Sequence, residues 1–184
     1  MTKQLKPDIP QLKENERKKR ANQIQLLLSD CDGVLTDNGV YYSNRGEEMK
    51  RFSIRDGMAV ALLQTAGIET GIISGEKSKS LQQRAEKLHI SHVYLGVTDK
   101  LQQLKDIASR YIIPLNAVAY IGDDVNDAGI MSALQKISLT AAPGDAVPSV
   151  LSMAHYICTA VGGHGAFREF SDWILNLRSK DIHS

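Results

Sequence analysis

Short apolar runs alternate with longer amphipathic stretches along this chain, a pattern typical of strands that alternate with helices. The run at 24–28 is short and, apart from Gln25, apolar, as expected for a buried strand of a parallel sheet. Further strands are predicted at 69–74, 92–95, 117–121, 137–140 and 156–157. Helices are predicted at 58–63, ending near residue 67, and at 77–89, 99–111, 126–134, 144–152 and 166–177. This alternation indicates an α/β fold, a Rossmann-like parallel sheet with helices on both faces.

A hairpin pattern interrupts the alternation directly after the first strand. Val40-Tyr41-Tyr42 and the segment 49–52 flank the polar stretch 43–48, and the turn-prone pair Asn38-Gly39 precedes them. We therefore predict a small inserted β-hairpin. Its position would place it over any site at the end of the first strand.

Residues 23–178 are predicted to form a single domain, between an N-terminal extension at 1–22 and a C-terminal tail at 179–184. The extension contains a basic run at 13–20, which is typical of a solvated helix or a tail. A chain of 184 residues is long enough to bury one substantial core.

The composition is that of an ordinary soluble globular protein, with 42% hydrophobic and 23% charged residues. The net charge of +1 indicates neither a nucleic-acid nor a membrane partner. No apolar run is long enough to span a bilayer, and the polar N-terminus lacks a signal-peptide core. Two cysteines do not make a disulfide framework, so we expect a cytoplasmic protein.

Two carboxylates follow the first strand directly. Asp30 and Asp32 are one residue apart, and Gly33 comes next. Along an extended backbone both side chains would point to the same side, at the edge of the sheet where open α/β folds bind ligands. Carboxylates that lie this close repel each other, so they usually bind a cation, share a proton or take different chemical roles.

Polar groups also stand near three later strands. Ser74-Gly75-Glu76 follows one strand and offers a hydroxyl and free N–H groups suited to phosphate. Lys100 begins a helix after Asp99, where a cation is unfavourable for the helix dipole. The stretch Gly122–Asp127 places three carboxylates and an amide after another strand, which favours a hard cation such as magnesium.

Together these four stretches resemble the haloacid dehalogenase-type phosphohydrolases. That family's Asp-x-Asp motif matches Asp30 and Asp32, its Ser or Thr motif matches Ser74, and its lysine matches Lys100. Its Gly-Asp-Asp-x-x-Asp motif matches residues 122–127. Because four matches coincide in order and spacing over residues 24–175, the resemblance predicts a magnesium-dependent phosphatase.

The resemblance implies a role for each matched residue. Asp30 would be the nucleophile and Asp32 the general acid and base. Magnesium would bind Asp30, the backbone carbonyl of Asp32, and Asp123. Ser74, Gly75 and Lys100 would hold the phosphoryl group, while Asp124, Asn126 and Asp127 would support the site.

A finer resemblance is to a cap-less branch of the family whose members dephosphorylate 3-deoxy-octulosonate 8-phosphate, a lipopolysaccharide sugar precursor. It rests on residues 32–39, the hairpin, Arg55-Asp56-Gly57 and the segment 162–169. It implies a phosphorylated sugar acid as substrate, with Thr36, Arg55 and Arg168 among the residues that bind it. It also implies a homotetramer in which a neighbour's hairpin and C-terminal segment complete the site.

One departure leaves the sugar open. Members of the octulosonate branch usually carry Arg after the glycine of the second motif, where this chain has Glu76. Glu76, with Lys87 eleven residues later, looks like phosphatases of nine-carbon ulosonic acid 9-phosphates. Alternatives of another class are a receiver domain phosphorylated on Asp and a non-catalytic sugar-binding regulatory domain.

Overall fold

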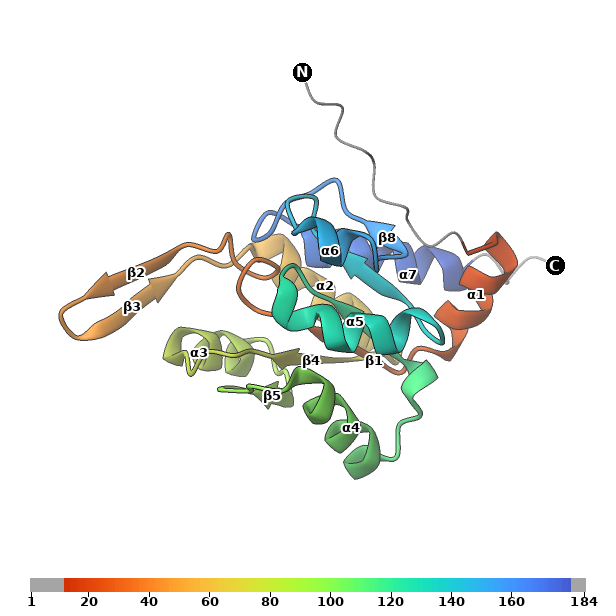
Figure 1. The fold of residues 1–184 in the computed structure, drawn as a ribbon, viewed down its shortest axis with the longest axis horizontal. Coiled ribbons are helices and arrows are strands. Elements are labelled where there is room, and N and C mark those ends of the chain that lie inside the picture. The colour runs from red at the N-terminus through yellow and green to blue at the C-terminus, as the bar shows by residue number, and fades with distance from the viewer. Residues whose placement is uncertain (1–11, 180–184) are drawn as a thin grey trace, which may run out of the picture.

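Six parallel strands form the central sheet, in the order β5-β4-β1-β6-β7-β8 (Figure 1). The computed structural model describes residues 12–179. The strands are β1 (Leu26–Ser29), β4 (Glu69–Ile73), β5 (His92–Tyr94), β6 (Val118–Ile121), β7 (Thr140–Ala142) and β8 (Tyr156–Ile157). Non-consecutive neighbours in the sheet are joined through helices, so the predicted Rossmann-like fold is confirmed.

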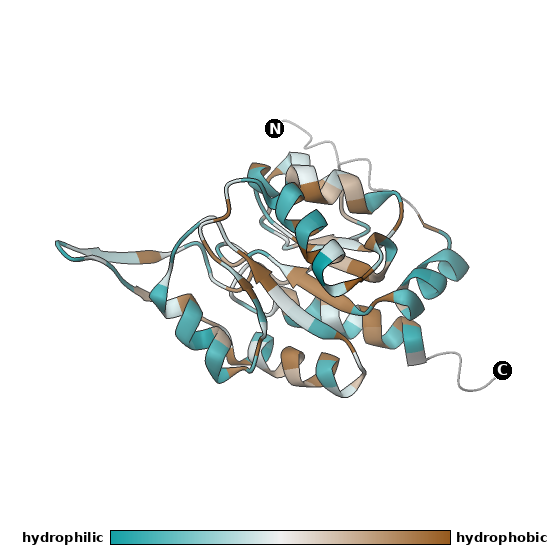
Figure 2. Cartoon of the chain, turned by 90° about the horizontal axis from the view of Figure 1, so that it is seen from below, coloured by the Kyte–Doolittle hydropathy of each residue, from teal (hydrophilic) through white to brown (hydrophobic). Residues whose placement is uncertain are grey.

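Helices cover both faces of this sheet, and the strands between them are strongly apolar (Figure 2). One face holds α1 (Glu14–Gln23), α2 (Ile54–Thr65), α3 (Lys79–Lys87) and α7 (Ala166–Ser179). The other face holds α4 (Lys100–Tyr111), α5 (Ala128–Gln135) and α6 (Pro148–Leu151). Alternation along β1 supplies both cores, because Leu27 packs toward the first face while Leu26 and Leu28 pack toward the second.

Several boundaries differ from the prediction for local reasons. Strand β7 spans Thr140–Ala142 rather than the predicted 137–140. Helix α5 is followed by a turn in which the N–H groups of Ile137 and Ser138 donate to the carbonyl of Leu134, so these two residues are not available to the strand. Helix α2 begins earlier than predicted, because the hydroxyl of Ser53 caps it by accepting from the N–H of Asp56. The helix predicted at 126–134 starts as a 3₁₀ turn at Val125–Asp127, and α6 is shorter than the predicted 144–152.

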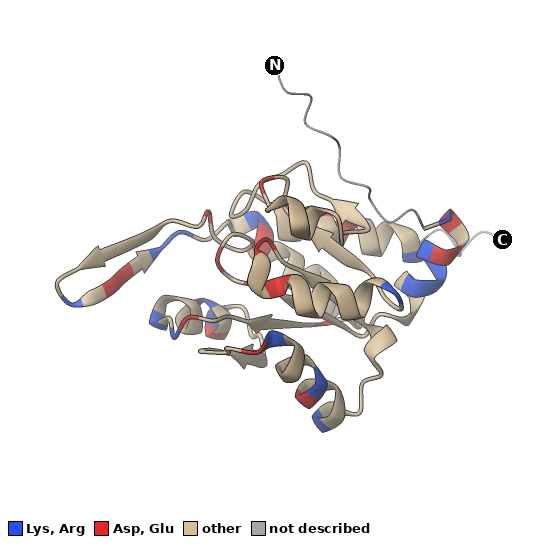
Figure 3. Cartoon of the chain, in the orientation of Figure 1, with Lys and Arg blue, Asp and Glu red and all other residues tan. Residues whose placement is uncertain are grey.

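The basic run of the N-terminal extension forms α1, a helix that carries charges of both signs (Figure 3). Helix α1 packs against α7, and Ala21 is fully buried. The Arg20 guanidinium donates to the carbonyl groups of Gln135, Lys136 and Ser138, and thereby joins α1 to the end of α5. The part of the extension at 1–11 lies outside the described residues, as does the part of the tail at 180–184.

The predicted hairpin consists of β2 (Val40–Ser43) and β3 (Gly46–Lys50), and it projects from the body of the protein (Figure 1). Its strands pair up to Ser43 and Gly46, so the turn is shorter than the polar stretch 43–48. Tyr41 and Tyr42 are largely exposed. Across residues 12–179, no helix combines the length and the apolar character that crossing a membrane requires.

A buried histidine predicts how stability depends on pH. The Nδ1 atom of His155 accepts the N–H of Thr140 at 3.1 Å, and burial, followed by the charge of Arg20, lowers the pKa of His155 to about 4. The unfolded chain therefore binds a proton more readily than the folded protein as pH falls from about 6.5 toward 4. Acidification across this window should lower the free energy of unfolding by on the order of 2 kcal/mol through this residue.

The variant His155→Asn keeps an acceptor near Thr140 but does not titrate. Urea unfolding at pH 7.5 and pH 5 should show a smaller loss of stability on acidification in this variant than in the unmodified protein. Identical losses in the two proteins would contradict the assigned protonation state.

Candidate active site

The ends of three central strands converge on one cleft. Ser29, the last residue of β1, is paired with Ile72 of β4 and Ile121 of β6, so the residues that follow these strands meet at one edge of the sheet. The cleft has a volume of about 170 Å³ and is lined by Asp30, Asp32, Asn38, Ser74, Gly75, Glu76, Asp123, Asp124 and Asn126. Figure 3 shows acidic residues on the loops near the start of α5. The sequence-predicted motifs at the ends of these three strands therefore meet in space.

A buried ion-pair cluster forms one wall of the site. The Nζ atom of Lys100 lies 2.8 Å from Oδ2 of Asp30 and 2.6 Å from Oδ1 of Asp127, and all three side chains are buried. Burial and the charge of Asp127 raise the pKa of Asp30. Burial alone would lower the pKa of Lys100, but the charges of Asp30 and Asp127 outweigh it, so this pKa is raised. The unfavourable position of Lys100 at a helix start is thus offset by two carboxylates.

Asp127 organises the loop after β6. Its Oδ2 atom accepts the N–H groups of Asp123 at 2.9 Å and Asp124 at 3.3 Å, and its Oδ1 atom accepts from the Tyr120 hydroxyl at 2.6 Å as well as from Lys100. Both oxygens are therefore engaged in hydrogen bonds. Asp124 in turn accepts the N–H of Val125 and begins the 3₁₀ turn. These two acidic residues shape the loop that presents Asp123.

Asp123 is the carboxylate best placed to hold a cation together with Asp30. Its Oδ1 atom is buried and has no hydrogen-bond partner among residues 12–179. Burial raises the pKa of Asp123 to about 6. Oxygens of Asp30, Asp123 and Asp127 all lie within 4.8 Å of one another, and those of Asp127 already accept hydrogen bonds. A pair of hard oxygen ligands with one unsatisfied atom fits magnesium.

The loop between Asp30 and the hairpin approaches this carboxylate closely. Gly33 has φ +84°, and a Cβ atom there would lie 1.9 Å from Oδ2 of Asp123, so glycine is required. Asn38 is also in the left-handed region, with φ 62°, and its Nδ2 atom donates to Oδ2 of Asp123 at 3.3 Å. The sequence interpretation treated Asn38 as a turn residue and missed this contact.

Asp32 faces the cleft from the same loop and is held by a lysine of the hairpin. The Nζ atom of Lys50 lies 2.8 Å from both carboxylate oxygens of Asp32. Thr36 donates to Oδ1 of Asp32 at 3.3 Å. Sequence reasoning did not single out Lys50, because a lysine at the end of a short polar strand is most often a surface residue.

The loop after β4 completes the cleft. Ser74 is buried, and its Oγ atom accepts the N–H of Glu76 at 3.1 Å. Gly75 and Glu76 line the cleft and are exposed, so Glu76 can reach a molecule bound there. Ser74 and Lys100 stand near Asp30 from two different elements, an arrangement that can hold a phosphoryl group beside the carboxylate.

Known proteins resemble this chain in sequence and in fold. Residues 89–169 match the family model described as haloacid dehalogenase-like hydrolase. The 3-deoxy-D-manno-octulosonate 8-phosphate phosphatase KdsC of Yersinia pestis is 41% identical over 161 residues, which cover 88% of this chain and 84% of the relative. The chain belongs to this phosphatase family of the haloacid dehalogenase-like hydrolases.

Solved structures of the family have the same fold. The structure of the Yersinia pestis phosphatase matches with a TM-score of 0.84 and 40% identity, covering 90% of this chain and 88% of that chain. The phosphatase of Moraxella catarrhalis matches with a TM-score of 0.83 and 34% identity, covering 90% and 94%. The latter structure contains magnesium ion, phosphate ion and KDO. The predicted family resemblance is confirmed.

Apart from Lys100, which pairs with Asp30 behind the cleft lining, four residues predicted to bind substrate do not line the cleft of their own chain within the described structure. Thr36 is fully buried and contacts Asp32 instead. Arg55 is exposed in the first turn of α2, and Lys87 is exposed in the last turn of α3. The Arg168 side chain pairs with Asp172 of the same helix at 2.7 Å. These residues lie on a loop and on helices outside the cleft lining, a placement that motif spacing does not reveal.

The glycine-rich segment before α7 packs against the loop between β1 and the hairpin of its own chain. A Cβ atom on Gly162 would lie 2.1 Å from the carbonyl oxygen of Gly33, and one on Gly163 would lie 2.5 Å from the nitrogen of Asp37. The Gly163 N–H donates to the carbonyl of Val34 at 2.9 Å. These small residues allow the segment to support the loop that carries Asp32.

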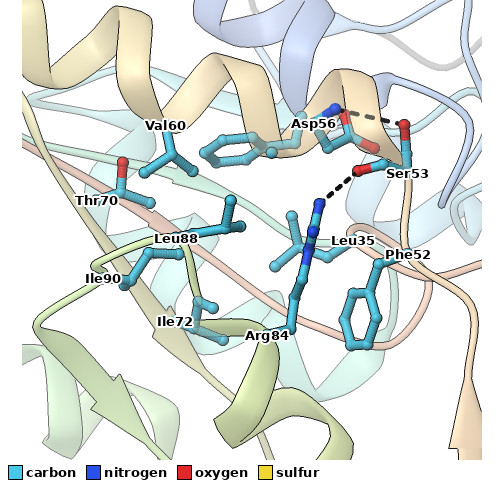
Figure 4. Close-up of a pocket in the computed structure, with 12 residues that line it drawn as sticks. Leu35, Phe52, Ser53, Asp56, Val60, Thr70, Ile72, Arg84, Leu88 and Ile90 are labelled. Carbon is cyan, nitrogen blue, oxygen red and sulfur yellow. Dashed lines mark hydrogen bonds between the residues drawn. The ribbon is translucent and has the colours of Figure 1, made fainter. Parts of the chain in front are cut away.

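Figure 4 shows a second cavity, between α2, α3 and β4. Most of its lining is apolar and includes Phe52, Val60 and Leu88, while Arg84 donates to the carbonyl of Ser53 at 3.0 Å. Its volume of about 20 Å³ is enough for roughly one water molecule. It does not include the carboxylates of the cleft at the strand ends and is too small for a sugar phosphate.

Proposed function

We propose that this protein is a magnesium-dependent phosphatase that hydrolyses 3-deoxy-D-manno-octulosonate 8-phosphate to the free sugar acid and phosphate. The observation that carries this proposal is the juxtaposition of Asp30, paired with Lys100 at 2.8 Å, with Asp123, whose buried Oδ1 atom has no hydrogen-bond partner among the described residues. Such a site offers an oxygen nucleophile, a cation to hold the phosphoryl oxygens, and ligands for a metal. Named relatives with this activity support the choice of reaction.

The first half of the reaction transfers the phosphoryl group to the protein. A carboxylate oxygen of Asp30 forms a bond to phosphorus, and the bond between phosphorus and the sugar oxygen breaks. The carboxyl group of Asp32 gives its proton to the departing oxygen. Lys100 and Ser74 stabilise the negative charge on the phosphoryl oxygens.

The second half releases phosphate. Asp32, now a carboxylate, takes a proton from water as the water oxygen bonds to phosphorus, and the bond from phosphorus to Asp30 breaks. Asp30, Asp123 and the backbone carbonyl of Asp32 would hold magnesium. When bound, this ion supplies charge neutralisation for the phosphoryl group. Asn38 and Asp127 keep Asp123 and its loop in position throughout.

A nine-carbon ulosonic acid 9-phosphate is the second candidate substrate. The observation that favours it is Glu76, an acidic residue that lines the cleft where it can contact sugar hydroxyls. Lys87, its predicted partner, lies in the last turn of α3 and does not line the cleft of its own chain, among the residues described. This separation favours the eight-carbon substrate.

We also propose that the protein acts as a homotetramer whose hairpins and C-terminal segments help to close neighbouring sites. Exposed apolar side chains of Tyr41, Tyr42 and Met49 on the projecting hairpin support this proposal, because such residues commonly mark contact surfaces. In such a tetramer, Arg55 and Arg168 would bind substrate in the site of a neighbouring subunit rather than in the cleft of their own chain. A cytoplasmic location is proposed from the unpaired, buried state of Cys31 and Cys158.

The test is phosphate release with 3-deoxy-D-manno-octulosonate 8-phosphate and, separately, with a nine-carbon ulosonic acid 9-phosphate. We expect at least a tenfold higher kcat/KM for the eight-carbon substrate, which is about 1.4 kcal/mol of discrimination. Activity should disappear with a chelator and return with magnesium. Preference for the nine-carbon substrate would make Glu76 a specificity residue. Phosphate release from neither sugar nor an aryl phosphate would favour a receiver or a sugar-binding domain.

A further inference from the structure

Lys50 is a buried, charged side chain on a hairpin that is otherwise largely exposed. Its side chain has no exposed surface, although all of β2 and the two residues before Lys50 in β3 are exposed. It is the last residue of β3, at the point where the hairpin rejoins the body of the protein. A lysine is seldom fully buried unless it is paired, so this position calls for a partner.

The partners of Lys50 lie on the catalytic side. Its Nζ atom is 2.8 Å from both oxygens of Asp32 and 3.5 Å from Oε2 of Glu47. Burial opposes the charge of Lys50, but the hydrogen bonds that it donates to Asp32, together with the charge of that carboxylate, raise the pKa of Lys50. The two-oxygen contact leaves the Asp32 side chain little rotational freedom.

The same lysine connects Asp32 to the loop after β4. Glu47 accepts a hydrogen bond from the Ser78 hydroxyl, and Ser78 caps α3 by accepting the N–H of Leu81. Ser78 stands four residues after Ser74. Asp32, Lys50, Glu47 and Ser78 therefore form a continuous chain of polar contacts from the catalytic loop through the hairpin to the start of α3.

We propose that Lys50 is a positioning residue that holds Asp32 in the orientation needed for proton transfer, with Glu47 and Ser78 anchoring the lysine. This inference rests on the proposed function, in which Asp32 serves as acid and base. Lys50 touches neither the nucleophile Asp30 nor its partner Lys100 in the contacts of the described residues. Its effect on the reaction is transmitted through Asp32.

This role predicts that the effect of removing Lys50 depends on the leaving group. A sugar alkoxide is a poor leaving group and needs the proton of Asp32 as the phosphorus–oxygen bond breaks. A p-nitrophenolate ion leaves without protonation. Because kcat/KM reports the steps up to release of the first product, it isolates this proton donation from the later attack of water.

The experiment compares Lys50→Met with the unmodified protein on a sugar phosphate that the latter hydrolyses and on p-nitrophenyl phosphate. We expect kcat/KM to fall about 10- to 100-fold on the sugar phosphate and less than about threefold on p-nitrophenyl phosphate. Lys50→Arg keeps a charged, two-pronged donor and should recover part of the loss. Lys105→Met removes an exposed lysine from α4, outside the hairpin and the cleft, and should change neither value.

Equal losses on the two substrates, or no loss on the sugar phosphate, would overturn the positioning role. Circular dichroism and thermal unfolding establish whether Lys50→Met is folded. If it is not folded, Glu47→Gln is tested on the same two substrates, because this variant loosens the anchor of Lys50 without contacting Asp32. We expect its kcat/KM to fall about threefold on the sugar phosphate and to stay unchanged on p-nitrophenyl phosphate. Failure of the unmodified protein to hydrolyse either sugar phosphate would instead reject the proposed function.

Discussion

Replacing Asp30 with asparagine should abolish phosphate release, with kcat lower by at least about 10⁴-fold, while the protein stays folded. An amide oxygen is too weak a nucleophile to displace a sugar oxygen from phosphorus. It can still accept a hydrogen bond from Lys100, and Asp127 remains to balance that cation. Loss of one of three clustered carboxylates also relieves repulsion, so thermal stability should be unchanged or higher.

Two measurements check this prediction. Steady-state phosphate release gives the loss of activity, and acid quenching followed by mass spectrometry shows whether a phosphorylated protein forms. The unmodified protein should give a phosphorylated species during turnover, and Asp30→Asn should give none. Asp106→Asn removes an exposed carboxylate from α4 and serves as the control. Normal turnover by folded Asp30→Asn would reject Asp30 as the nucleophile.

Replacing Lys100 with methionine should damage both activity and stability. The change leaves the buried carboxylates of Asp30 and Asp127 without the cation that lies between them. Removing one member of a buried ion pair typically costs about 3 kcal/mol or more, which lowers the melting temperature by about 5–10 °C in a protein of this size. Loss of a cation at the phosphoryl group should lower kcat by about 10²- to 10³-fold.

Magnesium should separate the two effects of this variant. A divalent cation at Asp30 and Asp123 replaces part of the lost positive charge, so it should raise the melting temperature of Lys100→Met more than that of the unmodified protein. It should not restore kcat, because the phosphoryl contact is still missing. Lys105→Met, which removes an exposed lysine from the same helix, is the control. An equal magnesium response in the two proteins would contradict this placement of the cation.

The grouping of residues in the candidate site could be predicted because it depends on where strands end. Apolar runs mark where β1, β4 and β6 lie, and parallel pairing brings the residues after them to one edge. Asp30, Ser74 and Asp123 follow those strands directly or within two residues, so motif spacing was enough to group them. The seventh strand was misplaced because Ile137 looks like a strand residue, although backbone hydrogen bonds place it in the turn after α5.

Residues on loops and helix surfaces were predicted less well. Lys50 and Asn38 lie in or beside the hairpin, where an isolated polar residue carries no distinguishing pattern. Arg55, Lys87 and Arg168 were selected by motif position, and the structure places them on helices that do not line the cleft of their own chain, within residues 12–179. Spacing along a chain does not specify the path that a loop takes or the face that a helix exposes.

The sequence by itself determined the α/β architecture, the inserted hairpin and the carboxylates at the end of the first strand. Periodicity and strand ends are local properties, so they can be read from neighbouring residues. Only the tertiary structure decided that Lys100 is shared between Asp30 and Asp127, and that Lys50 reaches back 18 residues to hold Asp32. These contacts join distant segments, and they form because a buried charge must be paired once the fold has removed it from water.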